Sequence, residues 1–199
     1  FQISNQQVAN GYTLSLWFLN TTTSGLCTTM YSMNFLNGWL VGTYIPQCYN
    51  WGPGSLTVYI SNPSSQNVGQ NVLPSFVAWQ NVAITVNFTS NNVGVYRNGN
   101  LVFNIIPSNT MSPTSVSSLS ISGTALYANL QLYNTSLSAN EIQALYQEGI
   151  GGAPIDLQHL VAWYPLNGDL NDYSGNGNNG GVPTNVKFVS NWWNGYTPP

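Results

Sequence analysis

Apolar and polar residues alternate along much of the chain, which is the pattern of half-buried β-strands. The stretches YTLSLWFL at 12–19 and LTVYI at 56–60 both follow it. From residue 79 onward, three β-rich runs are separated by Ser-Asn-Asn at 90–92 and by Asn-Gly at 98–99. Asn-Gly is a strong signal for a type I′ hairpin turn, so this region predicts an antiparallel meander. Two further strands are expected in SLSIS and LYANLQLY.

One segment has helical periodicity, and its start is marked by a capping signal. Ser138 is the expected N-cap, and Glu141 completes a capping box. A glycine follows the last turn, so a short helix is expected at about 138–148. Many short strands with a single helix predict an all-β fold, a two-sheet antiparallel jelly-roll sandwich.

Charged side chains make up only 4% of the sequence, with two Lys or Arg residues and a formal net charge of −3. Two cations cannot neutralise the phosphates of a nucleic acid or form a polybasic membrane patch, so neither partner is expected. No apolar run approaches the roughly 20 residues that cross a bilayer. The five carboxylates should make folding only weakly dependent on pH, which suits an acidic medium. Abundant uncharged polar residues point outside the cell, after removal of a signal peptide.

The two cysteines and three sequons fit the same extracellular setting. Cys27 and Cys48 predict one disulfide that closes a loop of about 20 residues, and two buried free thiols are the alternative. Asn20, Asn87 and Asn134 each begin an Asn-x-Ser/Thr sequon. We therefore expect a secreted glycoprotein.

Four stretches carry a family resemblance: YTLSLWF, WQNVAITVN, VYRNGNLV and LQLYNTSLSANEIQALY. In this order they resemble the laminin-G-like or concanavalin A-like lectin-glucanase jelly-roll superfamily, over roughly residues 1–146. In that family the domain opens with a piece similar to LVAWYPLNGDLNDYSGNGNNG, followed by a strand like VKFV. Here that piece follows the helix, at 160–180, so the order is rotated.

A jelly roll without its opening piece exposes a strip of core and a row of unpaired backbone groups. The rotation therefore divides the chain into an incomplete head domain at 1–148, a linker at 149–156 and a complementing C-terminal segment at 157–199. Our leading hypothesis is that this segment acts as a donor strand in a neighbouring subunit, which gives a head-to-tail polymer of identical subunits. Self-complementation in a circular permutant is one alternative, and a fragment of tandem jelly rolls is another. The expected anchors of the segment are large apolar residues: Leu160, Val161, Trp163, Tyr164, Leu166, Phe188, Val189, Trp192 and Trp193.

The leading functional hypothesis is a structural subunit of an extracellular glycosylated filament with a role such as cell adhesion. The uncharged, sequon-bearing composition resembles subunits of thread-like filaments made by acid-loving thermophilic archaea. The alternative is a secreted, cell-surface carbohydrate-binding module of the lectin type. Trp39, Trp51, Trp192 and Trp193 fit both hypotheses, as platforms for stacking on surface glycans or as anchors between subunits.

The sequence offers no catalytic residues. Glycoside hydrolysis needs two carboxylates about 5 to 9.5 Å apart, but Glu141 and Glu148 belong to the expected helix and no strand carries a Glu-x-Asp-x-Glu pattern. Asp156 and His159 lack the Gly-x-Ser-x-Gly elbow that would complete a serine triad. We therefore expect a protein that is not an enzyme and that requires no cofactor.

The loop GDLNDYSGNGNNG is the candidate metal site. Asp169, Asp172, Asn176 and Asn178 provide oxygens in a glycine-rich turn that suits a hard cation such as calcium. The family resemblance implies calcium at Asp172. Relatives have a second carboxylate where this chain has Ala128-Asn129, which lowers the charge of the ligand set. The alternative is a plain loop held by Asx turns.

The two cations have simple interpretations. Lys187 lies in the proposed donor segment, where it is either a solvated edge charge or one partner of an isopeptide cross-link. Arg97 precedes the Asn-Gly turn and is interpreted as a surface residue.

Overall fold

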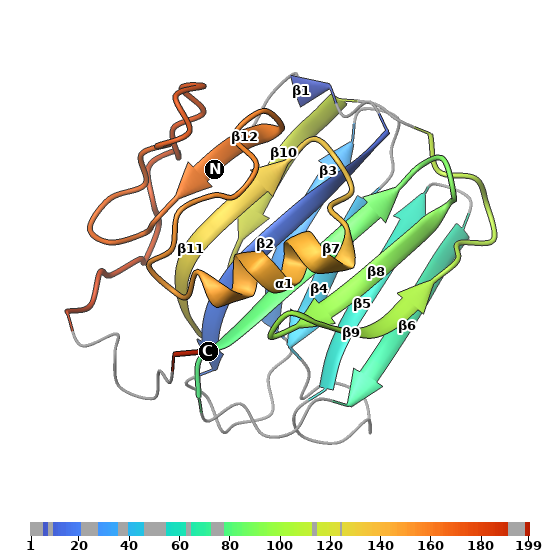
Figure 1. Cartoon of the computed structure of the whole chain (residues 1–199), viewed down its shortest axis with the longest axis horizontal. Helices are drawn as coiled ribbons and strands as arrows, with labels where there is room; N and C mark the ends of the chain where they lie inside the picture. The colour runs from blue at the N-terminus through green and yellow to red at the C-terminus, as the bar shows by residue number, and fades with distance from the viewer. Residues whose placement is uncertain are drawn as a thin grey trace.

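Two antiparallel sheets face each other in the computed structural model of the chain (Figure 1). The structure describes residues 6–7, 10–20, 28–35, 40–45, 55–62, 65–72, 78–112, 115–123, 125–190 and 198–199. The first sheet contains, in spatial order, β1 (Gln6–Gln7), β10 (Ser115–Ile121), β3 (Thr28–Phe35), β4 (Leu40–Ile45), β5 (Ser55–Asn62) and β6 (Ser65–Val72). The second sheet contains β12 (Leu160–Tyr164), β11 (Ala125–Tyr133), β2 (Gly11–Asn20), β7 (Gln80–Asn87), β8 (Asn92–Arg97) and β9 (Asn100–Ile105). This architecture confirms the predicted jelly-roll sandwich.

Strand β2 is buried on both of its faces, which the simple alternation did not predict. Leu14, Leu16 and Phe18 point into the core between the sheets and are fully buried. Each such side chain contributes about 1.5–3 kcal/mol by leaving water. On the other face, the hydroxyl of Thr13 donates to the carbonyl of Thr135 at 2.8 Å. The polar face of β2 is therefore satisfied by chain that packs over it.

The predicted type I′ hairpin joins β8 to β9. Asn98 and Gly99 both have positive φ angles, 47° and 77°, as this turn requires. The side-chain oxygen of Asn98 also accepts from the backbone N–H of Asn81 at 2.9 Å, which ties the turn to β7. This local prediction is confirmed.

The helix α1 (Ala139–Gln147) lies across the outer face of the second sheet (Figure 1). Its capping box is present: Ser138 accepts from the N–H of Glu141, and the Glu141 carboxylate accepts from the N–H of Ser138 at 2.7 Å. Ile142 and Leu145 are buried in a cluster that includes side chains of β7, β8 and β11. No helix in the described part of the chain has the length and apolar character needed to cross a bilayer.

The segment 149–156, expected as a linker, packs closely against the sandwich. Ile150 is buried beside Trp79, and the carbonyl of Gly152 accepts from the side chain of Asn129 at 2.9 Å. A Cβ at Gly152 would lie 2.5 Å from the carbonyl oxygen of Glu148, so only glycine fits there. The segment thus leads the chain directly from α1 to β12.

The rotated C-terminal piece begins by completing the sheet of its own chain. β12 pairs antiparallel with β11, from Leu130 opposite Tyr164 to Tyr133 opposite Leu160. The edge position next to β11 is therefore filled within one chain, as the self-complementing alternative requires. Exchange of the segment between subunits stays a prediction.

Candidate functional site

The loop that follows β12 is organised around the carboxylate of Asp172. One oxygen accepts from the backbone N–H groups of Trp163 and Ser174, each at 2.9 Å. The other accepts from the N–H of Asn178 and the hydroxyl of Ser174, also at 2.9 Å. Three of these bonds close the loop on itself, and the bond from Trp163 ties it to β12.

Two asparagine side chains of the same loop bind the outer edge of β12. Asn176 donates from Nδ2 to the carbonyl of Leu160 at 2.8 Å, and Asn178 does so to the carbonyl of Val161 at 2.9 Å. The backbone N–H of Tyr173 adds a bond to the carbonyl of Trp163 at 2.7 Å. Unpaired groups on an edge strand invite pairing with another chain. The loop occupies these groups and so takes the place of a neighbouring strand.

The residues predicted to hold calcium do not fit a cation in this arrangement. Asp172 already accepts four protein hydrogen bonds, and the amide nitrogens of Asn176 and Asn178 are turned toward backbone carbonyls. Asp169 is half-buried, and the backbone N–H of Asn171, together with the hydroxyl of Tyr173, lowers its pKa. Across the described ranges, no three acidic, His or Cys side chains converge on one point. The geometry favours the Asx-turn alternative, and calcium binding stays an untested prediction.

A buried polar network fixes the face of β12 that is turned toward α1 and away from the core between the sheets. Trp163 donates from Nε1 to Oδ1 of Asn129 at 2.8 Å, and Gln131 donates to the same oxygen at 3.0 Å. Tyr133 donates from its hydroxyl to Gln131 at 2.6 Å, and burial raises the pKa of this tyrosine. Asn129 has a φ of 47° and lies at a β-bulge between β11 and β2, which aims its side chain at these partners.

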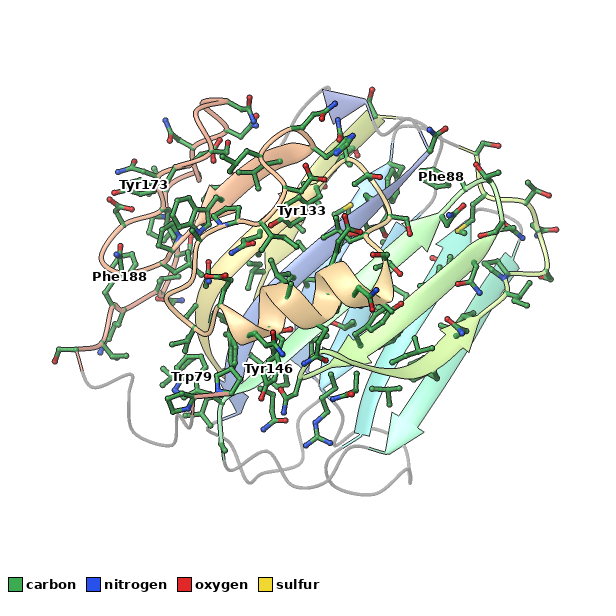
Figure 2. The ribbon with its side chains drawn as sticks, in the orientation of Figure 1. Trp79, Phe88, Tyr133, Tyr146, Tyr173 and Phe188 are labelled. Carbon is green, nitrogen blue, oxygen red and sulfur yellow. The ribbon has the colours of Figure 1, made fainter. Side chains whose placement is uncertain are left out.

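A groove of about 1000 Å³ lies between the start of β11 and the C-terminal segment. Trp79 and Tyr127 contribute to its wall on the sandwich side. Leu170, Asn185 and Phe188 contribute to the wall formed by the C-terminal segment. The hydroxyl of Tyr127 donates to the carbonyl of Ser122 at 2.7 Å, which fixes its ring. Figure 2 shows Trp79 and Phe188 on the same flank of the molecule.

The expected donor anchors separate into two groups. Leu160, Val161 and Tyr164 are buried in the sandwich, and Trp163 and Leu166 are half-buried. By contrast, the apolar side chains near the C-terminus are exposed: Val182 97%, Val186 52%, Phe188 46% and Val189 44%. Residues 165–190 form no strand, although the resemblance implied one at VKFV. The physical reason is that no neighbouring strand pairs with this backbone in the described structure.

Other predicted site residues are only partly described. Asn87 and Asn134 are half-buried, and the side-chain oxygen of Asn87 accepts from the N–H of Ser90 at 2.9 Å. Asn20 is the last residue of β2. Glycosylation at all three stays a prediction. The residues that lie outside the described ranges are Cys27, Cys48, Trp39, Trp51, Trp192 and Trp193.

The disulfide between Cys27 and Cys48 stays a prediction, because both residues lie outside the described ranges. His159 contacts Asp156 at 2.7 Å between Nδ1 and Oδ2, and its side chain is 41% exposed.

One polar cluster, formed by Gln80, Arg97 and Asn98, was not predicted from the sequence. Arg97 donates from Nε to the side-chain oxygen of Gln80 at 2.7 Å, and Asn98 donates to the same oxygen at 3.0 Å. The alternation of Val93, Val95 and Arg97 was the available signal, because it places Arg97 on the core-facing side of β8.

Chains of known structure share this fold. The binding domain of botulinum neurotoxin DC in complex with rat synaptotagmin II aligns with a TM-score of 0.54 at 16% identity, over 69% of this chain and 35% of that chain. The binding domain of the same neurotoxin in complex with SialylT aligns with a TM-score of 0.54 at 18% identity, over the same shares. A native heptameric SAP-like pentraxin from Limulus polyphemus gives 0.54 at 13% identity, over 73% of this chain and 75% of that chain.

These similarities confirm the lectin-like jelly-roll fold and no finer relationship. The chain spans about a third of the length of the neurotoxin chains. No protein-family model matches the sequence, and no curated protein matches it. The resemblance to archaeal filament subunits stays a prediction.

Proposed function

We propose that this chain is an extracellular binding module of the lectin type, and that it binds a glycan in the groove beside β11. The fold supports this proposal, because the similar structures include binding domains and a pentraxin, and one of those binding domains was solved with SialylT. Fold similarity alone does not assign a ligand. The class of ligand is therefore inferred from the side chains that line the groove.

The main support for glycan binding is the set of side chains that line the groove. Ligand sites typically have volumes of about 300–1000 Å³, with apolar and aromatic walls and a few polar groups. Here Tyr127 and Phe188 supply aromatic surface, Trp79 lies buried behind the wall, and Asn167 and Asn185 supply amides. A sugar presents the same combination, with C–H faces that pack on rings and hydroxyls that bind amides.

Phe188 is the residue with which to test the groove. Its side chain is 46% exposed, so its truncation should leave the fold intact. A glycan array followed by titration calorimetry identifies the ligand and its affinity. We expect Phe188→Ala to weaken binding about fivefold to tenfold, because an aromatic contact contributes about 0.5–1.5 kcal/mol beyond its buried area.

Ile106 provides the matched control. It is also an exposed apolar residue, at 75%, and it does not line the groove. Ile106→Ala should bind the glycan like the unmodified protein. Equal affinities for Phe188→Ala and Ile106→Ala would overturn the groove as the binding site. An array with no bound glycan would overturn the function itself.

A second candidate function is the structural subunit of an extracellular filament of identical subunits. One observation favours it: Val182, Val186, Phe188 and Val189 lie exposed on backbone without a paired strand. Such a segment is suited to pairing with the sheet of another copy. Residues 186–189 are then better donors than residues 160–164, whose outer edge the Asp172 loop already binds.

Negative-stain imaging and sedimentation separate the two functions. A filament subunit forms long fibres at high concentration, and Val186→Asp should abolish them because a charge cannot enter an apolar pocket unpaired. A glycan-binding module stays as discrete particles with or without Val186→Asp. Fibres that persist in the variant would contradict donation through residues 186–189.

A further inference from the structure

Arg97 lies at one end of the sandwich on the core-facing side of its sheet. It is the last residue of β8 and lies opposite Val82 of β7, and Val82, Val93 and Val95 are all fully buried in the main core. Arg97 itself is half-buried. The end of the core is thus marked by a guanidinium group where the strand pattern would otherwise continue with an apolar side chain.

The orientation of this guanidinium is set by Gln80. The oxygen of Gln80 accepts from Nε of Arg97 at 2.7 Å and from Nδ2 of Asn98 at 3.0 Å. The nitrogen of Gln80 donates to the carbonyl of Trp79 at 3.0 Å. Gln80 is only 7% exposed, so all its polar atoms are engaged in a buried environment. Such a fully bonded amide holds one edge of the guanidinium in place.

The other edge of the guanidinium has no protein acceptor within the described ranges of the chain. Among the described residues, Arg97 makes no further side-chain hydrogen bond. All five carboxylate side chains belong to the described part of the chain, and the one ion pair found there joins His159 to Asp156. Burial also lowers the pKa of Arg97, which shows that its charge is partly desolvated. A bound anion would relieve that cost.

The terminal N–H groups of a guanidinium form a planar fork that matches the two oxygens of a carboxylate. The chain has a net charge of −3, which repels anions at long range. The protein can therefore attract an anion only at short range, through the planar fork of the Arg97 guanidinium. Neither Arg97 nor Gln80 lines the groove, but the side chain of Gln80 donates to the carbonyl of Trp79, which does line it.

We propose that Arg97 binds the carboxylate of an acidic sugar through its two terminal NH2 groups. The proposal rests on the glycan-binding function above, and it adds the class of sugar and the residue that recognises it. Gln80 is a positioning residue, because it acts through Arg97.

Arg97 is the only arginine of the chain, so the protein gives a single arginine Nε–Hε resonance in a ¹⁵N spectrum. That resonance is followed during titrations with glucuronate, glucose and acetate at constant ionic strength. We expect a saturable shift with glucuronate, none with glucose, and one at least about tenfold weaker with acetate, which lacks the sugar ring. Equal affinities for glucuronate and acetate would overturn recognition of a sugar acid. A resonance that no carboxylate moves would overturn the anion site.

Three variants test the geometry of the fork. Arg97→Gln should weaken glucuronate binding by at least about tenfold, since a charge-assisted bidentate bond is lost. Arg97→Lys keeps the charge but loses the fork, so it should also bind several-fold more weakly. Gln80→Leu keeps the charge of Arg97 but removes the amide that orients it. The affinity for glucuronate should therefore fall, but less than in Arg97→Gln. Circular dichroism confirms that each variant is folded, and full affinity in Arg97→Lys would contradict bidentate recognition.

Ile106→Asp is the matched control for charge. It changes the net charge by the same amount as Arg97→Gln, at an exposed position roughly 20 Å away along β9. It should bind glucuronate nearly as well as the unmodified protein. An equal loss in both variants would reduce the effect to long-range attraction and overturn the proposal. If neutral glycans bind the groove but glucuronate does not shift the Arg97 resonance, glycan binding is retained as the function and only the specificity for acidic sugars is wrong.

Discussion

The C-terminal region divides near Gly180 into two parts with opposite environments. Residues 160–164 form β12, which pairs with β11 on one edge and is bound by the Asp172 loop on the other. Residues 182–189, VPTNVKFV, are less apolar, and they have no paired strand and remain exposed. The buried segment therefore combines a continuous apolar run with a partner for its backbone, and the exposed segment has neither.

The largest expected difference is between one aromatic residue of each part. Tyr164 is fully buried, and its hydroxyl donates to the carbonyl of Asn178. Tyr164→Ala should lower the free energy of unfolding by about 3–5 kcal/mol, because it leaves a large cavity. Phe188→Ala should change it by less than about 0.5 kcal/mol. Urea denaturation of both variants measures this, and similar losses would show that the two parts are buried alike.

A smaller effect is expected from the two carboxylates of the loop. Asp172→Asn replaces acceptors with an NH2 group that faces N–H donors, so it should lower the free energy of unfolding by about 2–4 kcal/mol. Asp169→Asn, whose side-chain partners are the exposed residues Asn171 and Tyr173, should cost less than about 0.5 kcal/mol. Thermal and chemical unfolding compare the pair. If the Asp172 variant were as stable as the Asp169 variant, the loop would not be what holds the edge of β12.

The stability of the loop should depend on pH through Asp169. Hydrogen bonds lower the pKa of Asp169 in the folded state. Its contribution is therefore present above the unfolded pKa, near 4, and is lost as the pH falls through the lower folded value. Carbon-13 NMR of the carboxyl group should show a titration midpoint below that of an unstructured aspartate. A midpoint at or above it would contradict the bonds from Asn171 and Tyr173.

The smallest expected effect is that of calcium. Because the oxygens of Asp172 already accept four hydrogen bonds, millimolar calcium should change the melting temperature by less than about 1 °C. A rise of several degrees would show that the loop rearranges to bind the ion. The same titration with Asp172→Asn would then show whether Asp172 is a ligand.

Local signals made much of the fold predictable. The capping box at Ser138 and the Asn-Gly turn at 98–99 depend on neighbouring residues, and both are present as expected. The alternation along β2 located its core face. It could not show that the opposite face would also be buried, because the chain that covers it comes from more than a hundred residues away.

The candidate sites were less predictable for the same reason. The Asp172 loop was located from its residue types, but its partners are backbone groups of β12 that only the fold brings together. The groove joins the start of β11 to residues 181–190, which no local pattern connects. The choice between the same chain and a neighbouring chain as partner of β11 depends on long-range contacts, and a pattern along one sequence does not encode that choice directly.

Hydrogen–deuterium exchange of the dilute protein tests the division of the C-terminal region most directly. We predict strong protection of the amides in residues 160–164, including Trp163, and exchange within seconds in residues 185–190. Slow exchange in residues 185–190 of the monomer would contradict their exposure. Protection of residues 160–164 that appears only as the protein concentration rises would show that β12 is supplied by a neighbouring subunit.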